Sequence, residues 1–297
     1  MRKLISLLFL LWLAFTSFAQ QHSHVDFEIP ELKKGEQVIH HVGFSLVYNE
    51  PYEQASWVAY EITADETVKR YERTNHFLTD SKILTGSADN ADYMGSGYDK
   101  GHLAPAGDME WSAESCAESF YFSNMSPQVP AFNRGIWETL EEFVRINAVT
   151  NSSVYVVTGP VLKPGLPVIG HNQVAIPAYY YKVILDYREP VKKGIGFVLQ
   201  NQESHNSIQV YAMSIDEVEK NTGINFFPSL TKDEEKLLES HFDLNSWNWG
   251  HEKSQSSSAV VVKNKSTSIQ CSGTTKKGLR CKTMTTNANG RCYLHQL

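Results

Sequence analysis

Hydrophobic and polar positions alternate along the chain with two different periods. A spacing of three to four residues, typical of an amphipathic helix, is clearest at residues 136–146, where positions 136, 137, 140, 143 and 144 are apolar. Elsewhere, short runs rich in β-branched and aromatic residues end at Gly, Pro or charged residues, and such runs predict strands. The predicted strands are residues 56–63, 154–158, 178–187, 196–200 and 208–213.

Two helix starts carry a signal of their own. In each, a Ser or Thr is followed three residues later by a Glu, at positions 214–217 and 231–234. These side chains satisfy backbone N–H groups that the first turn of a helix leaves without partners. We expect the second of these helices to cover residues 236–242. Together with two strands that pair around a turn at 189–193, these elements predict an α+β fold with a largely antiparallel sheet.

The first residues differ from the rest of the chain. Residues 1–19 begin with two basic residues, continue with an apolar stretch at 4–15 and end in small residues, which is typical of a secretory signal cleaved after Ala19. The alternative is an uncleaved anchor, although the apolar stretch is short for a bilayer. We therefore expect a secreted or periplasmic protein, with no stable membrane association after cleavage, in a compartment that permits disulfides.

Composition divides the remainder into a globular domain at residues 24–249, a Ser-rich linker at 250–268 and a small unit at 269–297. With 297 residues, 41% of them hydrophobic, the chain is not a disordered or collagen-like protein. Residues 252–297 contain eight Lys/Arg and one acidic residue, a net charge of +7, whereas the rest contains 19 basic and 32 acidic residues, a net charge of −13. This asymmetry indicates a polyanionic partner.

Three polar residues are candidates for chemistry. His102 follows Gly101, and an imidazole can take a proton from water near neutral pH, although a histidine in this setting is often structural. Asn133 is either the N-cap of the predicted helix or, through its carbonyl oxygen, a ligand of a hard cation such as Mg²⁺. Glu141 follows about 12 Å further along a helix. It is therefore either a surface carboxylate or a group that holds a metal-bound water.

Several separated segments share a pattern with one family of enzymes. Residues 99–109 read DKGHLAPAGDM, residues 123–128 read SNMSPQ, and residues 132–137 read FNRGIW. In this order they resemble the motifs of the sugar-non-specific DNA/RNA endonuclease family, whose first motif is Asp-Arg-Gly-His. The likeness extends over roughly residues 40–230, which is most of the predicted domain.

The resemblance implies a ββα-metal nuclease fold and hydrolysis of phosphodiester bonds with one hydrated Mg²⁺ or Mn²⁺ ion. In that scheme His102 is the general base, Asn133 is the direct protein ligand of the metal, and Glu141 holds a metal-bound water. Asn124 orients His102 or the substrate. The expected substrates are DNA and RNA, because a site that contacts phosphate and sugar reads no base edges. The expected products carry 5′-phosphate and 3′-hydroxyl ends.

The chain departs from the family motif at one position. Lys100 stands where the family has Arg, so a point charge replaces a planar group that can hold a phosphate with two hydrogen bonds. We expect looser positioning of the phosphate and retained activity. Arg73, in a polar segment upstream, is the candidate for a second phosphate contact, and the alternative is a solvated arginine. Asp99 is expected to form hydrogen bonds or a turn rather than to bind the metal.

The C-terminal unit has the composition of a metal-binding module. Cys271, Cys281, Cys292 and His295 follow the spacing C-x9-C-x10-C-x2-H. Three thiolates with one imidazole suit tetrahedral Zn²⁺. The alternative is a disulfide, which leaves one of the three tail cysteines over unless Cys116 joins it. The basic residues around this site make the unit a candidate tether for nucleic acid.

These observations predict a secreted, Mg²⁺-dependent endonuclease of broad nucleic-acid range with a small Cys/His-rich C-terminal module. Two alternatives stay open. One is a module that binds nucleic acid through its basic tail and has lost turnover, and the other is a phosphodiesterase that acts on other polymers of the cell envelope. The sequence predicts no particular oligomeric state.

Overall fold

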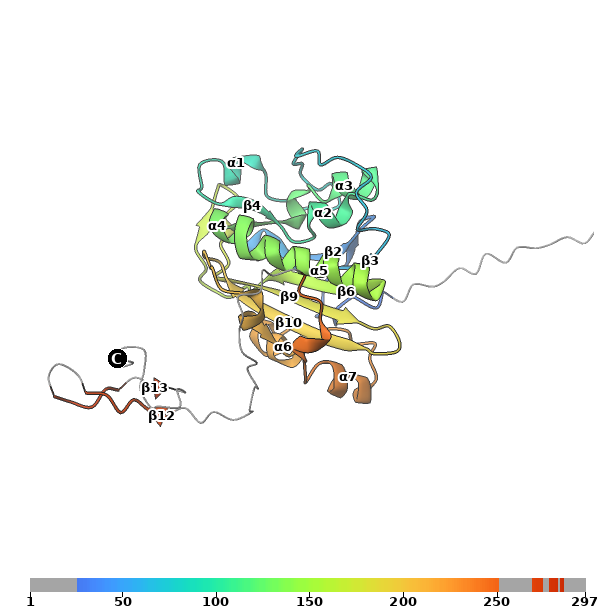
Figure 1. Ribbon diagram of the computed structural model, residues 1–297. Helices are drawn as coiled ribbons and strands as arrows, with labels where there is room; N and C mark the ends of the chain where they lie inside the picture. The colour runs from blue at the N-terminus through green and yellow to red at the C-terminus, as the bar shows by residue number, and fades with distance from the viewer. Residues whose placement is uncertain (1–25, 251–268, 275–277, 283, 286–297) are drawn as a thin grey trace, which may run out of the picture. The chain divides into compact units, whose positions relative to one another are not determined.

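The computed structural model describes residues 26–250, 269–274, 278–282 and 284–285, and these fall into two units that divide after Gly250 (Figure 1). The predicted signal segment and almost all of the predicted linker lie outside the described residues. Among the helices of the described ranges, none has the length and apolar character that crossing a membrane requires.

A seven-stranded sheet forms the centre of the first unit, and every neighbouring pair of strands in it is antiparallel. The order of the strands is β1-β2-β3-β6-β9-β10-β11. The predicted antiparallel sheet is therefore confirmed. Its strands are β1 (Ile39–His40), β2 (Ser45–Asn49), β3 (Gln54–Thr63), β6 (Ser153–Pro160), β9 (Tyr179–Asp186), β10 (Lys193–Gln200) and β11 (Ala212–Met213).

Four of the five predicted strands are present, and the fifth is wrong over most of its length. In that segment Ile208–Tyr211 forms a 3₁₀ helix, η4, and a strand follows only in the last two residues. The Ser207 side chain caps η4 by accepting a hydrogen bond from the backbone N–H of Gln209. Because Val210 is exposed, the apolar residues here do not share one buried strand face.

Both faces of the sheet are covered by helices (Figure 1). On one face, α5 (Glu138–Asn151) contributes to the first hydrophobic core. On the other face, α6 (Ile215–Thr222) and the end of α7 (Lys232–Leu238) contribute to the second core. Because successive residues of a strand point to opposite faces, β6 places Val156 in the first core and Val157 in the second, and both are fully buried.

The predicted helix starts are confirmed in detail. Ser214 and Thr231 each accept a hydrogen bond from the backbone N–H three residues later, and the carboxylates of Glu217 and Glu234 each accept one from the backbone N–H of the capping residue. The second helix nevertheless begins directly after its cap and ends four residues before the predicted end of 236–242. The prediction followed the apolar residues, whereas the cap determines where the helix starts.

The ββα unit lies beside the first core. In it, β4 (Asp99–His102) pairs antiparallel with β5 (Met125–Gln128), which continues through α4 (Pro130–Phe132) and the wide π-helical turn η3 (Asn133–Trp137) into α5. This arrangement confirms the fold class that the resemblance implied. The other elements are η1 (Glu50–Tyr52), α1 (Asn90–Tyr93), α2 (Ala106–Met109), α3 (Ala113–Glu118), η2 (Phe122–Asn124), β7 (Val168–Ile169), β8 (Val174–Ala175), η5 (Leu244–Ser246), β12 (Ile269–Gln270) and β13 (Met284–Thr285).

The second unit is described in part. Its strands β12 and β13 pair antiparallel. Cys271 and Cys281 are buried and pack against each other. The two other predicted zinc ligands, Cys292 and His295, lie outside the described residues, so the zinc set stays a prediction. Cys116, in the first unit, is buried and forms no disulfide with the cysteines that the structure describes.

Candidate active site

One pocket brings together most of the predicted site residues. It has a volume of about 490 Å³, and β4, η3 and α5 all contribute to its walls. Among the predicted residues, Arg73, Lys100, His102, Asn133 and Glu141 line it, and Asn124 does not. The other lining residues are Asn75, Phe77, Asp99, Pro105, Ala106, Gly107, Glu110, Arg134, Glu138 and Arg145.

His102 ends β4 with a buried imidazole on the pocket wall, and the residue is 8% exposed. The ring packs edge-on against Phe120, with 4.9 Å between the ring centroids. Its Nε2 atom has no hydrogen-bond partner among the residues that the structure describes. Burial, followed by the positive charges of Arg73 and Lys100, lowers the pKa of His102 to about 3. The side chain is therefore a neutral imidazole with an unused nitrogen, which is the form that a general base needs.

The glycine before His102 is required by the pairing of β4 with β5. A Cβ atom on Gly101 would lie 2.2 Å from the side chain of Gln128. Because Gln128 is fully buried, that side chain has no room to withdraw. Glycine at this position therefore lets the two strands approach closely enough to present His102 at the end of β4.

Two cations flank the histidine, and aromatic rings hold both of them. The guanidinium carbon of Arg73 lies 5.3 Å from the centroid of Phe120, and its Nε donates to Oδ1 of Asn75 at 2.7 Å. The Nζ atom of Lys100 lies 3.9 Å from the centroid of Phe77. Burial lowers the pKa of Lys100. Arg73 is thus an exposed arginine with a polar and an aromatic partner on the pocket wall, and its contact with phosphate stays a prediction.

Asn133 is held in one orientation. Its Nδ2 donates to Oδ2 of Asp99 at 2.9 Å, and because a carboxylate only accepts, this contact fixes which side of the amide faces Asp99. The carbonyl oxygen Oδ1 is the atom left for the pocket, and no described residue donates a hydrogen bond to it. Since Asn133 has helical backbone angles and directly follows α4, it is not an N-cap, and that alternative is wrong.

The wide turn η3 explains how Asn133 reaches this position. Within it, Gly135 leaves helical geometry, with φ −125° and ψ −110°. The adjacent Arg134 donates two hydrogen bonds to Asp99, from Nε at 2.8 Å and from Nη2 at 2.6 Å. Asp99 therefore binds Asn133 and Arg134 together and joins β4 to the turn. The expectation that Asp99 forms hydrogen bonds is confirmed.

Glu141 lines the same pocket from α5 and is half-buried. Burial raises the pKa of its carboxyl, and the nearby Lys182 ammonium acts in the opposite direction. Lys182 is fully buried in β9, its Nζ has no hydrogen-bond partner among the described residues, and it lies 4.8 Å from the centroid of Trp137. A half-buried carboxylate that is coupled to a buried ammonium is not a surface carboxylate, so the simpler alternative for Glu141 is wrong.

The comparison with known proteins agrees with this geometry. Residues 26–233 match the family described as DNA/RNA non-specific endonuclease, which is more than half of the chain. The chain belongs to this family. A solved structure of an EndoG/EndoGI complex contains a chain that is 34% identical, with a TM-score of 0.65, and the match covers 70% of this chain and 91% of that chain.

Relatives in the endonuclease family are similar over the same region. "Nuclease EXOG, mitochondrial" from Danio rerio is 32% identical over 69% of this chain and 64% of its own length. "Nuclease C1" from Cunninghamella echinulata var. echinulata is 36% identical over 63% of this chain and 81% of its own length. The chain spans less than two thirds of the length of the mitochondrial relatives EXOG from zebrafish, Xenopus laevis and mouse.

Asn124 does not line the pocket but contacts the backbone of the segment that follows His102. Its side chain is fully buried, with Oδ1 accepting from the backbone N–H of Ala104 and Nδ2 donating to the carbonyl oxygens of Ala104 and Ser119. Its own carbonyl accepts from the N–H of Leu103. These bonds fix the backbone that leaves His102, so Asn124 positions the histidine segment and does not contact the pocket.

Two pocket residues of α5 were not predicted. Glu138 and Arg145 lie three residues before and four residues after Glu141, so the helical period places all three on one face. Arg145 donates from Nη1 to Oδ1 of the buried Asp108 at 2.8 Å, and the Tyr60 hydroxyl donates to Oδ2 of the same carboxylate at 2.8 Å. Periodicity counted from Glu141 was therefore the signal that would have found them.

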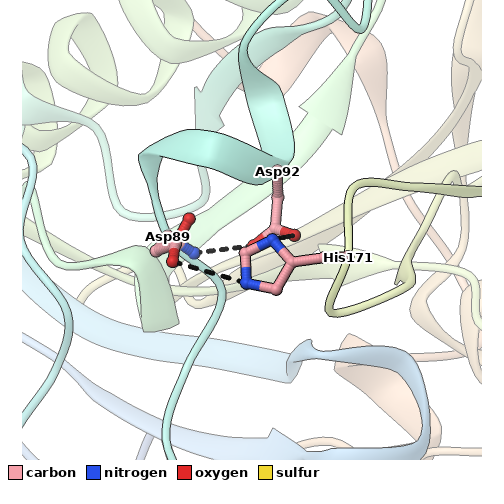
Figure 2. A group of neighbouring side chains, drawn as sticks. All are labelled: Asp89, Asp92 and His171. Carbon is pink, nitrogen blue, oxygen red and sulfur yellow. Dashed lines mark hydrogen bonds and ion pairs between the residues drawn. The ribbon is translucent and has the colours of Figure 1, made fainter.

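A group of acidic and histidine side chains lies outside the pocket around His102. Figure 2 shows the His171 ring between two carboxylates, with Nδ1 3.3 Å from Oδ1 of Asp92 and Nε2 3.6 Å from Oδ2 of Asp89. The buried Asp92 already accepts hydrogen bonds from the backbone N–H groups of Asp89 and Asn172 and from Nδ2 of Asn172. Because these donors occupy its oxygens, the group fastens the loop at Asn172 to α1.

Proposed function

We propose that this protein is a metal-dependent endonuclease that hydrolyses phosphodiester bonds of DNA and RNA with little sequence preference. The observation that carries the proposal is the neutral imidazole of His102, which has an unpartnered Nε2 and lines a pocket together with Asn133, Glu141 and the cations Arg73 and Lys100. Membership of the endonuclease family and the nuclease names of its relatives support the same reaction.

The donor atoms of the pocket suit one hydrated Mg²⁺ or Mn²⁺ ion. Hard cations of this kind prefer oxygen ligands, and Mg²⁺ keeps several of its waters. Asn133 offers a carbonyl oxygen, and Glu138 and Glu141 offer carboxylates that can hold metal-bound waters. Asp99 is committed to its hydrogen bonds with Asn133 and Arg134. When bound, such an ion would stabilise the charge of the transition state and of the departing 3′-oxygen.

Substrate binding strengthens the base. In the free protein, burial and the charges of Arg73 and Lys100 lower the pKa of His102 to about 3, which is far from the optimum for proton transfer near neutral pH. A phosphate between these two cations neutralises them, so the proton affinity of the imidazole rises when the substrate arrives. His102 then takes a proton from the water that attacks phosphorus, the bond to the 3′-oxygen breaks, and the 5′-phosphate remains on the other product.

The broad substrate range follows from the groups that line the pocket. Arginine and lysine side chains contact phosphates, which DNA and RNA share, and such contacts carry no base sequence. The body of the chain is strongly acidic, whereas the tail beyond residue 251 has a net charge of +7. We infer that this tail holds the polyanionic substrate near the pocket. Removal of residues 252–297 then raises KM, most strongly at low salt where the attraction is least screened, and leaves kcat unchanged.

Two expectations from the sequence remain proposals about the ends of the chain. Residues 1–19 support export with cleavage after Ala19, and N-terminal sequencing of protein recovered from the culture medium tests this. Cys271, Cys281, Cys292 and His295 support a structural Zn²⁺ site. Metal analysis together with thiol counting on the full chain separates zinc from a disulfide.

A nicking assay on supercoiled plasmid tests the proposed activity. The natural chain is expected to nick with Mg²⁺ and to stop when EDTA removes the ion, and His102→Ala is expected not to nick. His205→Ala is the matched control, because His205 is exposed and does not line the pocket. If the natural chain retards DNA in a gel with Mg²⁺ present but never nicks it, the chain is a binding module and the proposal is wrong.

A further inference from the structure

Three carboxylates meet on the face of the sheet that carries α6 and α7. Asp216 and Glu219 belong to α6, and Glu239 directly follows α7. Each offers one oxygen such that these three atoms lie within 4.8 Å of one another. None of the three residues lines the pocket around His102.

Glu239 makes this cluster unusual. The residue is fully buried, and neither of its carboxylate oxygens has a hydrogen-bond partner among the described residues. The charges that act on it come from Glu219, Glu235 and Asp216, all of the same sign. Burial, followed by these charges, raises the pKa of Glu239 to about 8. A buried carboxylate with neither a donor nor a counterion is costly, so this environment calls for a cation.

The backbone holds the carboxylates in place. The N–H of Asp216 donates to the carbonyl oxygen of Glu239 at 3.0 Å, which ties the start of α6 to the end of α7. Oε1 of Glu219 accepts from the N–H of Phe226 at 2.8 Å, which leaves its second oxygen for another ligand. A Cβ atom on Gly194 would lie 2.4 Å from the carbonyl oxygen of Leu238, so β10 lies directly against the end of α7. These backbone contacts therefore fix the position of Glu239 next to Asp216.

A surface hollow gives access to the cluster from solvent. It has a volume of about 360 Å³, and Asp216 and Glu219 form part of its wall together with Gly223 and Asn225. Lys220 also lines the hollow, and its positive charge acts on Glu219 against the effect of burial. An ion and its waters can therefore reach Asp216 and Glu219 from solvent, whereas the buried Glu239 does not line the hollow.

We propose that Asp216, Glu219 and Glu239 bind one calcium ion. All three ligands are carboxylates, which hard cations prefer, whereas Zn²⁺ favours nitrogen and sulfur. The three oxygens lie within 4.8 Å of one another, so one ion with metal–oxygen distances of about 2.4 Å, which are typical of Ca²⁺, can touch all three; Mg²⁺, in contrast, usually keeps several waters and takes only one or two carboxylates. The cluster in Figure 2 differs, because hydrogen bonds already occupy the buried carboxylate there.

Calcium titration of the full chain tests the site, with Mg²⁺ present throughout so that the nuclease pocket does not contribute. Calorimetry is expected to give one site with a Kd on the order of 10⁻⁴ M, and saturating Ca²⁺ is expected to raise Tm by about 5 °C. Glu239→Gln and Asp216→Asn each keep the size of the side chain and remove one charged ligand, so each is expected to weaken Ca²⁺ binding at least about tenfold.

Glu235→Gln is the matched control. It removes one nearby negative charge from an exposed position of α7 without removing a ligand, so the Kd should change by less than about twofold. The proposal is overturned if the natural chain binds no Ca²⁺ beyond the Mg²⁺ background, or if Glu239→Gln and Asp216→Asn bind it as well as the natural chain. If Glu239→Gln does not fold, Asp216→Asn and Glu235→Gln decide the question. None of these outcomes depends on the nuclease activity.

Discussion

Two histidines of this protein are almost equally buried and lie in opposite surroundings. His102 is 8% exposed and His41 is 9% exposed. Nε2 of His41 lies 3.0 Å from Oδ2 of Asp80, and its Nδ1 lies 3.3 Å from Oε1 of Glu118. Nε2 of His102, in contrast, has no partner among the described residues, and the charges that act on the ring are positive.

The difference teaches that partners, rather than burial, decide what a buried imidazole does. Both ring nitrogens of His41 are occupied, so it fastens the segment before β2 to α3 and to the loop that contains Asp80. Burial alone would raise the pKa of Asp80, but hydrogen bonds from His41, Ser123 and the N–H of Lys82 lower it overall. His41 therefore stabilises the fold, whereas His102 keeps one nitrogen available for chemistry.

The largest expected effect separates activity from stability at His102. His102→Ala should lower the cleavage rate on the order of 10³-fold, because the general base is lost. The free energy of unfolding should fall by only about 1–2 kcal/mol, because the buried ring leaves a cavity beside Phe120 but gives up no hydrogen bond at Nε2. Initial rates of plasmid nicking and urea unfolding measure the two quantities. A variant that keeps a tenth of the natural rate would show that another group is the base.

The next effect concerns the metal. Asn133→Ala should lower the rate by about 10²-fold at fixed Mg²⁺, and additional Mg²⁺ should recover part of it, because a ligand of the ion is lost. Asn75→Ala is the matched control, since Asn75 also lines the pocket but binds Arg73. Rates measured across a Mg²⁺ titration give the comparison. An equal loss in both variants, with no recovery at high Mg²⁺, argues against a metal ligand at Asn133.

The effect at the other histidine should fall on stability and not on the cleavage rate. His41→Ala leaves the buried Asp80 without its main partner, so the free energy of unfolding should fall by about 3 kcal/mol. The cleavage rate per folded molecule should not change. His40→Ala, at a more exposed neighbour that is hydrogen-bonded to Ser45, should cost less than about 1 kcal/mol. An equal loss of unfolding free energy in the two variants would show that the contacts of His41 stabilise the fold no more than those of His40.

The smallest effect is a pH dependence at His102. Because its pKa in the folded protein is about 3, its NMR signals should not titrate between pH 8 and pH 5, whereas the urea-unfolded chain should show the ordinary value of about 6.5. The native state then binds fewer protons than the unfolded state at this position. His102 therefore subtracts stability progressively as the pH falls from about 6.5 towards 3. An imidazole signal that titrates near 6.5 in the folded protein would contradict this.

The sequence predicted the parts of the fold that are encoded locally. The two capping pairs and four of the five strands depend on residues close to one another, and they are present. The strand expected at residues 208–213 is mostly helical, because one cap at Ser207 outweighs a weak alternation of apolar residues. Local patterns also left the surroundings of His41 unpredicted, since Asp80 and Glu118 are distant from it in sequence.

Only part of the candidate site could be predicted, because here too the sequence reveals only what residues close to one another encode. His102 and Asn133 could be named from motifs, and so could Glu141, because each motif is contiguous. The partners that determine the chemistry of these residues are distant in sequence. The ammonium that acts on Glu141 belongs to Lys182, and the carboxylate that orients Asn133 belongs to Asp99. These contacts form only when separate strands and helices pack together, so no single stretch of sequence contains them.

The wide turn η3 has a consequence for how relatives of this chain diverge. Each residue of an α-helix advances about 100° around the axis, so deletion of Gly135 would turn Asn133 and Arg134 by about that angle relative to Glu141. Asp99 would lose both partners, while the helix on either side could still pack against the sheet. We therefore expect that a relative which aligns well elsewhere but lacks one residue at this turn has the same fold and no longer catalyses the reaction.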